Sequence, residues 1–467
     1  MFKVRPTTEE LFVSGGDARI ALDPLSGQNK YGCQPHPDPD LLDFASSTAS
    51  VISLAGYAAA DNLRERLLNE TDSFELAQQH IRMELLSDVS DLGVHLAFAT
   101  SGTDAHFMAA RYAARAEPLT VVMVEEAETG SGVRAALSSS SNQPVINAVS
   151  LRAVDGMPRP SEDIDADVSA LVQAAVALGR HVLLIMVDQS KTGIIAPSVF
   201  CVMQLHQLHP DHVAVLVDAC QFRIAKPALR AYLNQGFMVA VTGSKFFAGP
   251  SFSAALLLPV QFEQQREERN DLSLLLRWEA ALVEYRRFRE LPQSRVMEVM
   301  ENFAQAVQQR LASDPRFEPL AVPPLSRRPL IEAQSWDHLP SIFPFLLHHV
   351  TLSPISPPEG ESELASLREF QKHVGRRPLT REETLRVYRQ LAVSEQDGIG
   401  ARRCHLGQPV VCGVRNGIAV SALRLCLSAR LISDAMLPGG MDRLADDALV
   451  VLDKIAWLVD RLSDNSL

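Results

Sequence analysis

A lysine and an aspartate follow two apolar runs of the sequence, and together they could carry out covalent chemistry. Asp218 follows Leu216 and Val217, and Lys245 lies just after the run that ends at Val241. A lysine amine that burial makes less basic can form an imine with an aldehyde and can move a proton. A carboxylate that faces a pyridine ring keeps the ring nitrogen protonated, so that the ring accepts electrons. The pair therefore predicts a cofactor with both an aldehyde and a pyridine ring.

Hydroxyl groups and a helix start could bind a phosphate group of such a cofactor. Ser101, Gly102 and Thr103 end an apolar run and open a predicted helix, whose N-terminal N–H groups attract anions. Thr242 and Ser244 bring two more hydroxyl groups beside the lysine. An ordinary glycine turn is the alternative for the first segment. Taken together, these segments predict that the chain binds pyridoxal 5'-phosphate.

Two further segments could contact the hydroxyl group on the cofactor ring. Gln221 comes three residues after the aspartate. Ser190 and Gln189 lie in the segment 189–193 that follows another apolar run, and either of them could make this contact. A plain turn is the alternative for this second segment. Asp188 competes for the role of the acid that faces the ring, but its separation from the lysine fits that role less well.

The apolar runs that precede these residues predict the fold. They contain few polar residues and alternate with helical stretches, which is typical of a mostly parallel sheet with helices on both faces. Ligands bind at the carboxyl ends of the strands in such sheets. The seven runs are Val94–Ala99, Leu119–Val124, Val145–Leu151, Val182–Val187, Val213–Val217, Met238–Val241 and Ala254–Leu258. We therefore expect an α/β fold with a seven-stranded sheet covered by helices.

The rest of the chain predicts a smaller α+β domain. Helical stretches are expected at 262–291, 293–311, 361–374 and 440–462, and strands at 342–350 and 418–427. The first residues are rich in Pro, Gly and Asp and read as an extended arm. The predicted domains are an N-terminal arm at 1–45, a large cofactor-binding domain at 46–290 and a small C-terminal domain at 291–467.

Composition excludes several classes of protein. The chain has 467 residues, 46% of them hydrophobic, which suits a globular enzyme with a large core. A net charge of −12 argues against a nucleic-acid partner. No apolar run is long enough to cross a membrane, and the N-terminus lacks the apolar core of a secretion signal, so we expect a cytoplasmic protein. The six cysteines form no C-x-x-C pair, which predicts reduced thiols and no bound metal.

The motifs in their order resemble those of fold-type I pyridoxal phosphate enzymes, and most closely the branch of class V aminotransferases, cysteine desulfurases and kynureninase. The similar segments are 218–221, 242–245, and 190–193 with Pro197, and the resemblance covers about 44–258. It implies Lys245 as the catalytic residue, an amino acid or related amine as substrate, and a homodimer. In the segment 422–428 it implies that Arg424 binds the substrate carboxylate, although Arg415 and Arg430 could also serve.

Two segments depart from the family pattern or add to it. Ser244 stands where the family has a histidine, and the loop 125–132 has no aromatic side chain to stack on the ring, so that Glu128 or Thr129 could lie there instead. Cys404 lies in a basic, flexible-looking stretch, where a lowered thiol pKa would suit the mobile nucleophile of a desulfurase. A cysteine without a role is the alternative.

The reaction is left open by the sequence. Transamination is the first prediction, a lyase reaction such as β- or γ-elimination is the second, and a non-catalytic protein that keeps the fold is the third. Asn29 and Tyr31, in the N-terminal arm, are predicted to bind substrate or to reach the cofactor of a partner subunit. A loose surface arm is the alternative.

Overall fold

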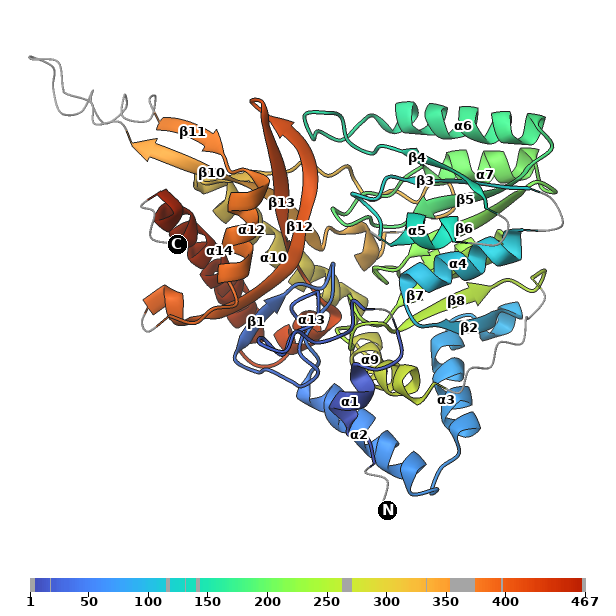
Figure 1. Cartoon of the computed structure of the whole chain (residues 1–467), viewed down its shortest axis with the longest axis horizontal. Helices are drawn as coiled ribbons and strands as arrows, with labels where there is room; N and C mark the ends of the chain where they lie inside the picture. Colours follow the sequence, from blue (N-terminus) through green and yellow to red (C-terminus); the bar gives the residue numbers. More distant parts are fainter. Residues whose placement is uncertain are drawn as a thin grey trace, which may run out of the picture.

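Two sheets form the centres of two bodies that lie side by side (Figure 1). The computed structural model describes residues 5–16, 18–114, 118–130, 132–139, 143–262, 271–332, 334–352, 374–395 and 398–463. We call the seven-stranded sheet with its helices the large body, and the second sheet with its helices the small body. No helix among these residues combines the length and the apolar character that crossing a membrane requires.

The sheet of the large body contains the seven predicted strands, each within two residues of its expected ends. Their spatial order is β2 (His95–Ala99), β8 (Ala254–Leu258), β7 (Met238–Thr242), β6 (Val213–Ala219), β5 (His181–Val187), β3 (Leu119–Val124) and β4 (Val145–Val149). All neighbours are parallel except that β8 runs antiparallel to β2 and β7. The predicted α/β fold class is confirmed.

The strands are mostly apolar because both faces of the sheet are buried, except at the edge strand β4, which is partly exposed. Along β5, Leu183 and Ile185 belong to one hydrophobic core, whereas Leu184 and Met186 belong to the other. The helices of this part of the chain are α2 (Leu54–Leu68), α3 (Phe74–Leu86), α4 (Gly102–Ala113), α5 (Val133–Ser138), α6 (Ser161–Ala177), α7 (Val199–Leu208), α8 (Lys226–Asn234) and α9 (Leu272–Arg289). Short 3-10 turns occur at Ser90–Leu92, Trp336–His338 and Gly398–Ala401.

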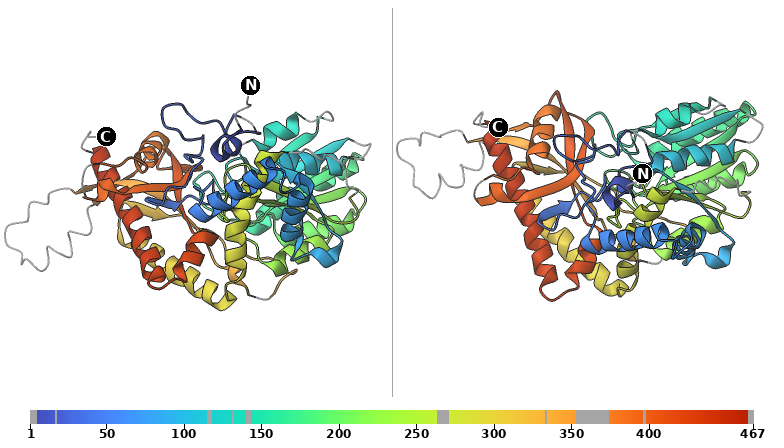
Figure 2. Two further views of the ribbon diagram at one scale, coloured as in Figure 1. Left: turned by 90° about the horizontal axis from the view of Figure 1, so that it is seen from below. Right: turned by 60° about the horizontal axis from the view of Figure 1, so that its bottom comes forward.

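The small body is built on a second sheet. Its strands are β1 (Leu41–Phe44), β12 (Arg403–Arg415), β13 (Ile418–Cys426), β10 (Ile342–Leu352) and β11 (Val374–Pro378), with β9 (Phe317–Pro319) paired to β10. Its helices are α10 (Gln293–Ser313), α12 (Arg381–Gln390), α13 (Ala429–Ala435) and α14 (Gly440–Ser463). The long helices α10 and α14 pack together and contact β9, β10 and β1 (Figures 1 and 2). Most of the helix predicted at 361–374 lies outside the described residues.

The N-terminal segment is tied to both bodies. Its short helix α1 (Thr8–Phe12) precedes a turn whose carbonyls accept hydrogen bonds from the fully buried Arg277 of α9, at 2.7 Å for Ser14 and 3.2 Å for Gly15. Farther along, β1 pairs in parallel with β12 of the small body. Part of the predicted arm is thus a strand of the second sheet, and the predicted domain limits stay a prediction.

Candidate active site

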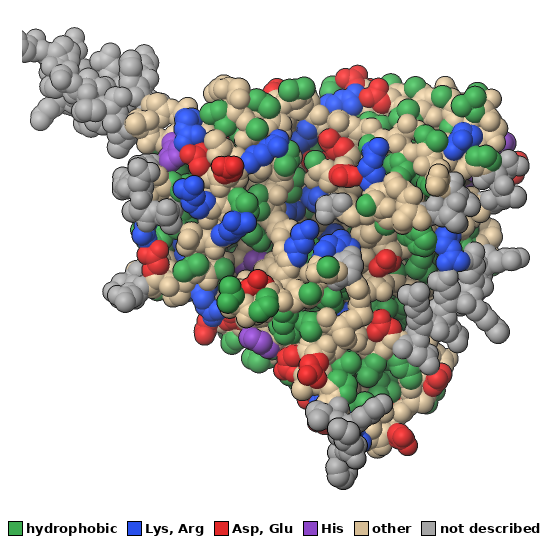
Figure 3. Space-filling view, viewed as in Figure 1, with side chains coloured by type: hydrophobic (Ala, Val, Ile, Leu, Met, Phe, Trp, Pro, Cys, Tyr) green, Lys and Arg blue, Asp and Glu red, His purple; other side chains and the backbone are tan. Residues whose placement is uncertain are grey.

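A cavity of about 500 Å³ opens where the two bodies meet. Basic side chains gather around this hollow on the molecular surface (Figure 3). Its floor comes from the ends of β5, β6 and β7 and from the start of α4, as expected for a ligand site in a parallel sheet. The predicted site residues that line it are Tyr31, Ser101, Gly102, Thr103, Ser190, Asp218, Gln221, Thr242, Ser244, Lys245 and Arg424.

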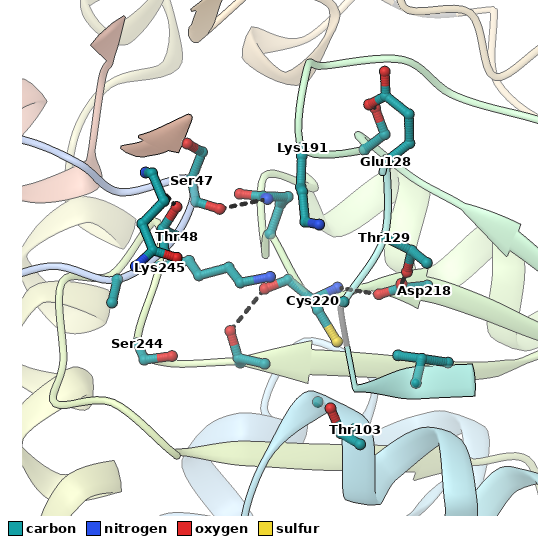
Figure 4. A pocket seen from close by; sticks show the side chains of 18 of the residues that line it. Ser47, Thr48, Thr103, Glu128, Thr129, Lys191, Asp218, Cys220, Ser244 and Lys245 are labelled. Atoms are coloured by element: carbon teal, nitrogen blue, oxygen red, sulfur yellow. Dashed lines mark hydrogen bonds between the residues drawn. The ribbon is translucent and has the colours of Figure 1, made fainter. Parts of the chain in front are cut away.

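Lys245 extends into the middle of the cavity (Figure 4). It follows β7 in a tight turn, where a side chain on Gly243 would meet the Ala281 Cβ of helix α9 at 2.6 Å. The carbonyl of Lys245 accepts hydrogen bonds from the Ala248 N–H at 3.0 Å and from the Ser50 hydroxyl at 3.3 Å. Among the described residues, none forms a hydrogen bond or ion pair with its Nζ. The backbone is fixed and the amine is left for a ligand.

Asp218 and His106 form a buried ion pair on the cavity floor. The Asp218 Oδ2 atom lies 3.2 Å from His106 Nε2, and both side chains are almost fully buried. Burial alone would raise the pKa of Asp218, but the charges of His106 and Lys245 hold it well below its ordinary value. Burial would lower the pKa of His106, and Asp218 raises it above its ordinary value. The carboxylate is therefore ionised.

His106 was not predicted from the sequence, although it is the main partner of Asp218. Its Nδ1–H donates to the Gly102 carbonyl at 2.7 Å, which turns Nε2 toward the carboxylate. Its position in the sequence could have indicated this role. It lies on α4 one turn after Gly102 and Thr103, on the side of the helix that faces the sheet.

Two more groups orient the carboxylate. The Thr129 hydroxyl donates to Asp218 Oδ2 at 3.0 Å, and the Cys220 N–H donates to Oδ1 at 3.1 Å. Among the described residues, His106, Asp218 and Cys220 are the only three metal-ligand types whose donor atoms lie within 4.8 Å of one another. Both carboxylate oxygens already accept hydrogen bonds. We therefore interpret the cluster not as a metal site but as a set of contacts that keeps Asp218 ionised.

The start of α4 offers an anion site. The Ser101 hydroxyl and the Asp104 carboxylate cap the helix reciprocally, so the N–H groups of Gly102 and Thr103 remain for a ligand. A side chain on Gly102 would meet the Cys220 Sγ atom at 2.9 Å. Of the two predicted hydroxyls beside the lysine, Thr242 donates to the Cys220 carbonyl at 2.7 Å. Thr103 and Ser244 both line the cavity floor (Figure 4).

Gln221 presents an acceptor to the cavity. Its Nε2 group donates to the Ser47 carbonyl at 3.0 Å, and its buried Oε1 atom accepts no hydrogen bond from any residue that the structure describes. Ser190 lines the same cavity, but its hydroxyl donates to Glu128 Oε2 at 2.6 Å. Glu128 also pairs with Arg152 at 2.9 Å, so its carboxylate is held by the protein. The predicted contact of Ser190 with a cofactor stays a prediction.

Arg424 lies on β13 at the small-body wall and is 1% exposed. Its Nη1 donates to the Lys191 carbonyl at 3.2 Å, and its Nη2 donates to the Thr48 hydroxyl at 2.9 Å and to the Gln408 carbonyl. Its Nε is buried and has no hydrogen-bond partner within the described part of the chain. No carboxylate of the described residues lies within ion-pair distance of this guanidinium. A buried cation without an anion is costly, which favours an anionic ligand here.

The two arm residues lie near the cavity of their own chain. Tyr31 lines it, with its ring 6.3 Å from that of Phe252. Asn29 lies instead at a small adjacent cavity, where its side chain accepts from the Tyr31 N–H at 2.9 Å and donates to Ser251 at 3.2 Å. The role of both residues in substrate binding stays a prediction.

The expected environment of Cys404 was wrong. This residue is fully buried in β12, not in a flexible stretch, and it is not among the residues that line the cavity. Burial raises the pKa of its thiol to about 11, and the neighbouring Lys454 and Arg402 offset only part of that effect. Basic neighbours in the sequence therefore do not activate this thiol, because burial is the larger effect.

Asp188, the alternative acid, faces away from the cavity. Arg327 binds both of its carboxylate oxygens at 2.7 Å, and the Tyr232 hydroxyl donates to it at 2.8 Å. Because all three side chains are buried, Asp188 neutralises Arg327 inside the protein. Of the two candidates for the acid that faces the cofactor ring, only Asp218 therefore lies on the cavity floor.

We expect Asp188→Asn to lower the free energy of unfolding by about 3 kcal/mol, because it leaves the buried Arg327 short of an anion. The value lies at the low end of the range for such pairs, since Asp337 remains 3.3 Å from Arg327. Urea unfolding measures the change. The control Asp167→Asn, in an exposed pair with Arg159, should cost less than about 1 kcal/mol. Equal costs for the two variants would contradict this role.

Comparison with solved structures identifies the fold. The glutamate decarboxylase domain of a diaminobutyrate-pyruvate transaminase and L-2,4-diaminobutyrate decarboxylase from Vibrio parahaemolyticus aligns with a TM-score of 0.52 and 14% identity, over 91% of this chain and 81% of that one. A NifS-like protein aligns with a TM-score of 0.52 and 13% identity, over 88% of this chain and 99% of that one. Mouse CSAD aligns with a TM-score of 0.50 and 14% identity, over 90% and 84% of the two chains.

These matches show that the chain has the fold of fold-type I pyridoxal phosphate enzymes, as the sequence resemblance implied. No protein-family profile matches the sequence, and neither does any curated protein. At 13–14% identity the likeness concerns the fold, so the chemistry must be argued from the cavity itself.

Proposed function

We propose that this chain is a pyridoxal phosphate-dependent enzyme that transfers the amino group of an amino acid or a related amine. The observation that carries the proposal is the pair formed by an uncommitted lysine amine and a buried, ionised aspartate in one cavity. Lys245 Nζ has no partner among the described residues, and Asp218 is held ionised by His106. The pair lies at the carboxyl ends of the strands, where parallel sheets of this kind bind ligands.

The residues around the pair fit the cofactor group by group. The ionised Asp218 suits a protonated ring nitrogen, and the unpartnered Oε1 of Gln221 suits the ring hydroxyl. The free N–H groups at the start of α4, with the Thr103 and Ser244 hydroxyls, suit the phosphate. Lys245 supplies the amine that reacts with the aldehyde. When bound, the cofactor would withdraw electrons from the carbon that carries the substrate amine.

The protein side chains then divide the remaining tasks. Lys245, at the centre of the cavity, takes a proton from the substrate carbon and returns it to another atom. Arg424 binds the substrate carboxylate, because its buried guanidinium lacks an anion. Tyr31 and the β12–β13 wall cover the cavity and limit access of water.

The cysteines argue against a reaction of the desulfurase type. All six lie in the described residues and are buried, and Cys220 is the one that lines the cavity. Burial and the neighbouring Asp218 raise the pKa of this thiol well above its ordinary value. A thiol nucleophile must be a thiolate to react, so Cys220 is poorly suited to attack a substrate sulfur, and the other five cysteines do not line the cavity. Elimination without a thiol nucleophile remains the second candidate reaction.

Borohydride reduction of the protein loaded with pyridoxal 5'-phosphate should give a stable adduct on Lys245, found by peptide mass mapping. Before reduction we expect an absorbance band near ~420 nm, which reduction removes. Treatment with a metal chelator before loading should leave the adduct yield unchanged. A reduced protein without the cofactor on Lys245 would overturn the proposed function.

Incubation with single amino acids, with and without pyruvate or 2-oxoglutarate, then separates the reactions. Formation of a new keto acid that requires the acceptor identifies transfer. Release of ammonia or sulfide without an acceptor identifies a lyase instead. The proposal also includes a homodimer that takes small-molecule substrates, as the family resemblance implies, and a cytoplasmic location, as the cysteine pattern and the N-terminal sequence suggest.

A further inference from the structure

The cavity carries more positive charge than the proposed reaction needs. Lys191, Lys245 and Arg424 line it, and no carboxylate of the described residues lies within ion-pair distance of any of the three. The acidic side chains buried beside them already have cationic partners. Glu128 pairs with Arg152 at 2.9 Å, and Asp218 lies 3.2 Å from His106.

Lys191 is the member of this set without a role in the reaction described above. The protein backbone fixes its place in the loop after β5, because its N–H donates to the Glu128 carbonyl at 2.9 Å and its carbonyl accepts from Arg424 at 3.2 Å. Its Nζ donates to the main-chain carbonyl of Glu126 at 2.9 Å, not to a carboxylate. Two of the three ammonium donors are thus left for a ligand.

The position of Lys191 excludes the phosphate end of the cavity as its target. Figure 4 shows its side chain on the side of Lys245 opposite to Thr103 and Ser244, which lie at the predicted phosphate site. Its main-chain carbonyl accepts a hydrogen bond from Arg424, the candidate for the substrate carboxylate, and the charge of Arg424 acts on its ammonium group in the same cavity. A substrate held by Arg424 therefore has a second cation within reach.

The charges around Lys191 favour the arrival of an anion. Burial, Arg424 and Lys245 lower the pKa of the Lys191 ammonium to about 8, and Glu128 and Glu126 offset only part of this effect. A lowered pKa means that the surroundings disfavour the charged form of the lysine. An anion that binds beside the lysine stabilises this charged form. The same anionic ligand would neutralise the buried charge of the Arg424 guanidinium.

We propose that Lys191 binds a second anionic group of the substrate, so that the enzyme acts on an amino acid with an acidic side chain. Arg424 takes one carboxylate and Lys191 takes the other. This assignment rests on the proposed function and adds to it the class of substrate. Aspartate-like and glutamate-like molecules have the required two carboxylates and one amine.

Binding of unreactive analogues to the cofactor-loaded protein tests this assignment. Isothermal titration compares succinate and glutarate with the monocarboxylates butyrate and valerate, which have the same chain lengths. We expect the better dicarboxylate to bind about 10- to 100-fold more tightly than its monocarboxylate, the effect of one charge-assisted hydrogen bond. Lys191→Met should bring this ratio close to one, whereas Lys191→Arg should keep it. Lys226→Met, at an exposed lysine, is the control.

The pH dependence provides a second readout. The dicarboxylate preference should be complete at pH 6.5 and should decline as the pH rises through about 8, because the lysine then loses its charge. The groups that face Lys191 are Arg424, Lys245, Glu126 and Glu128. In Lys191→Arg the preference should persist at pH 9, since a guanidinium remains charged.

Two results would overturn the assignment. They are equal binding of the two analogue types by the wild type, and a preference that survives in Lys191→Met, whether or not that variant binds pyridoxal phosphate more weakly. Each of these can occur while borohydride still fixes the cofactor on Lys245. Failure of this assignment is therefore distinct from failure of the proposed function.

Discussion

Lys245→Ala should lower kcat/KM by about 10³-fold or more, because it removes both the amine that reacts with the cofactor and the group that moves the proton. The protein should remain folded. Lys245 makes no side-chain hydrogen bond among the described residues, so we expect its free energy of unfolding to change by less than about 0.5 kcal/mol. Amino-group transfer assays and urea unfolding measure the two effects.

Two further variants separate the chemistry of this lysine from its charge. Lys245→Arg keeps a positive charge beside Asp218 but cannot react with an aldehyde at neutral pH, so it should be as inactive as the alanine variant. Lys226→Ala removes an exposed lysine at the start of α8 and should keep full activity. Activity of Lys245→Arg close to that of the wild type would show that charge, not covalent chemistry, is the contribution of this residue.

Asp218→Asn should lower turnover by roughly 10²-fold, because a neutral amide cannot keep a ring nitrogen protonated. It should also weaken cofactor binding, because the protonated ring nitrogen loses its anion. His106 loses its anion as well, and burial then disfavours the imidazolium. The pKa of His106, followed by NMR, should fall from above its ordinary value to below it. This shift reports on the ion pair independently of activity.

The matched control is Asp211→Asn, at an exposed aspartate just before β6. It should change neither the pKa of His106 nor the turnover. An unchanged His106 titration in Asp218→Asn would mean that the two side chains do not form the ion pair. Normal turnover with a shifted titration would mean that the ring nitrogen needs no carboxylate.

The large body could be predicted in detail because its strands are buried on both faces. A run such as Val182–Val187 has no competing interpretation once its length and its flanking turns are taken into account. Alternate residues of this strand pack into two separate cores, as Leu183 and Leu184 do. Every position of the run must therefore be apolar, and this continuous pattern is visible in the sequence without knowledge of the neighbouring strands.

The small body was predicted less well because its strands mix apolar and polar residues. Strand β12 runs from Arg403 to Arg415 and includes several polar or charged side chains, so its start reads as a flexible stretch. The burial of Cys404 depends in part on β1, whose Leu42 is its partner in the sheet although the two strands are far apart in sequence. Helix α2 was missed, since its apolar and polar residues are poorly segregated.

Within the site, the sequence indicated which residues come together but not their hydrogen-bond partners. Lys245, Asp218 and Gly102 follow strands whose carboxyl ends meet, so their proximity was predictable. His106 became visible as the partner of Asp218 only when the strand order placed α4 over β6. The attachment of Ser190 to Glu128 depends on two loops that meet only in the folded chain.

The pairing of β1 with β12 has a consequence for biosynthesis. His405 of β12 contacts Asp43 of β1, although 362 positions separate them in the chain. The strands of the large sheet all lie between residues 95 and 258, so that sheet can assemble while the ribosome is still translating the remainder. β1 must wait for its neighbour until the ribosome has translated β12, which ends at Arg415. A nascent chain therefore exposes an unpaired strand edge, which chaperones are suited to protect.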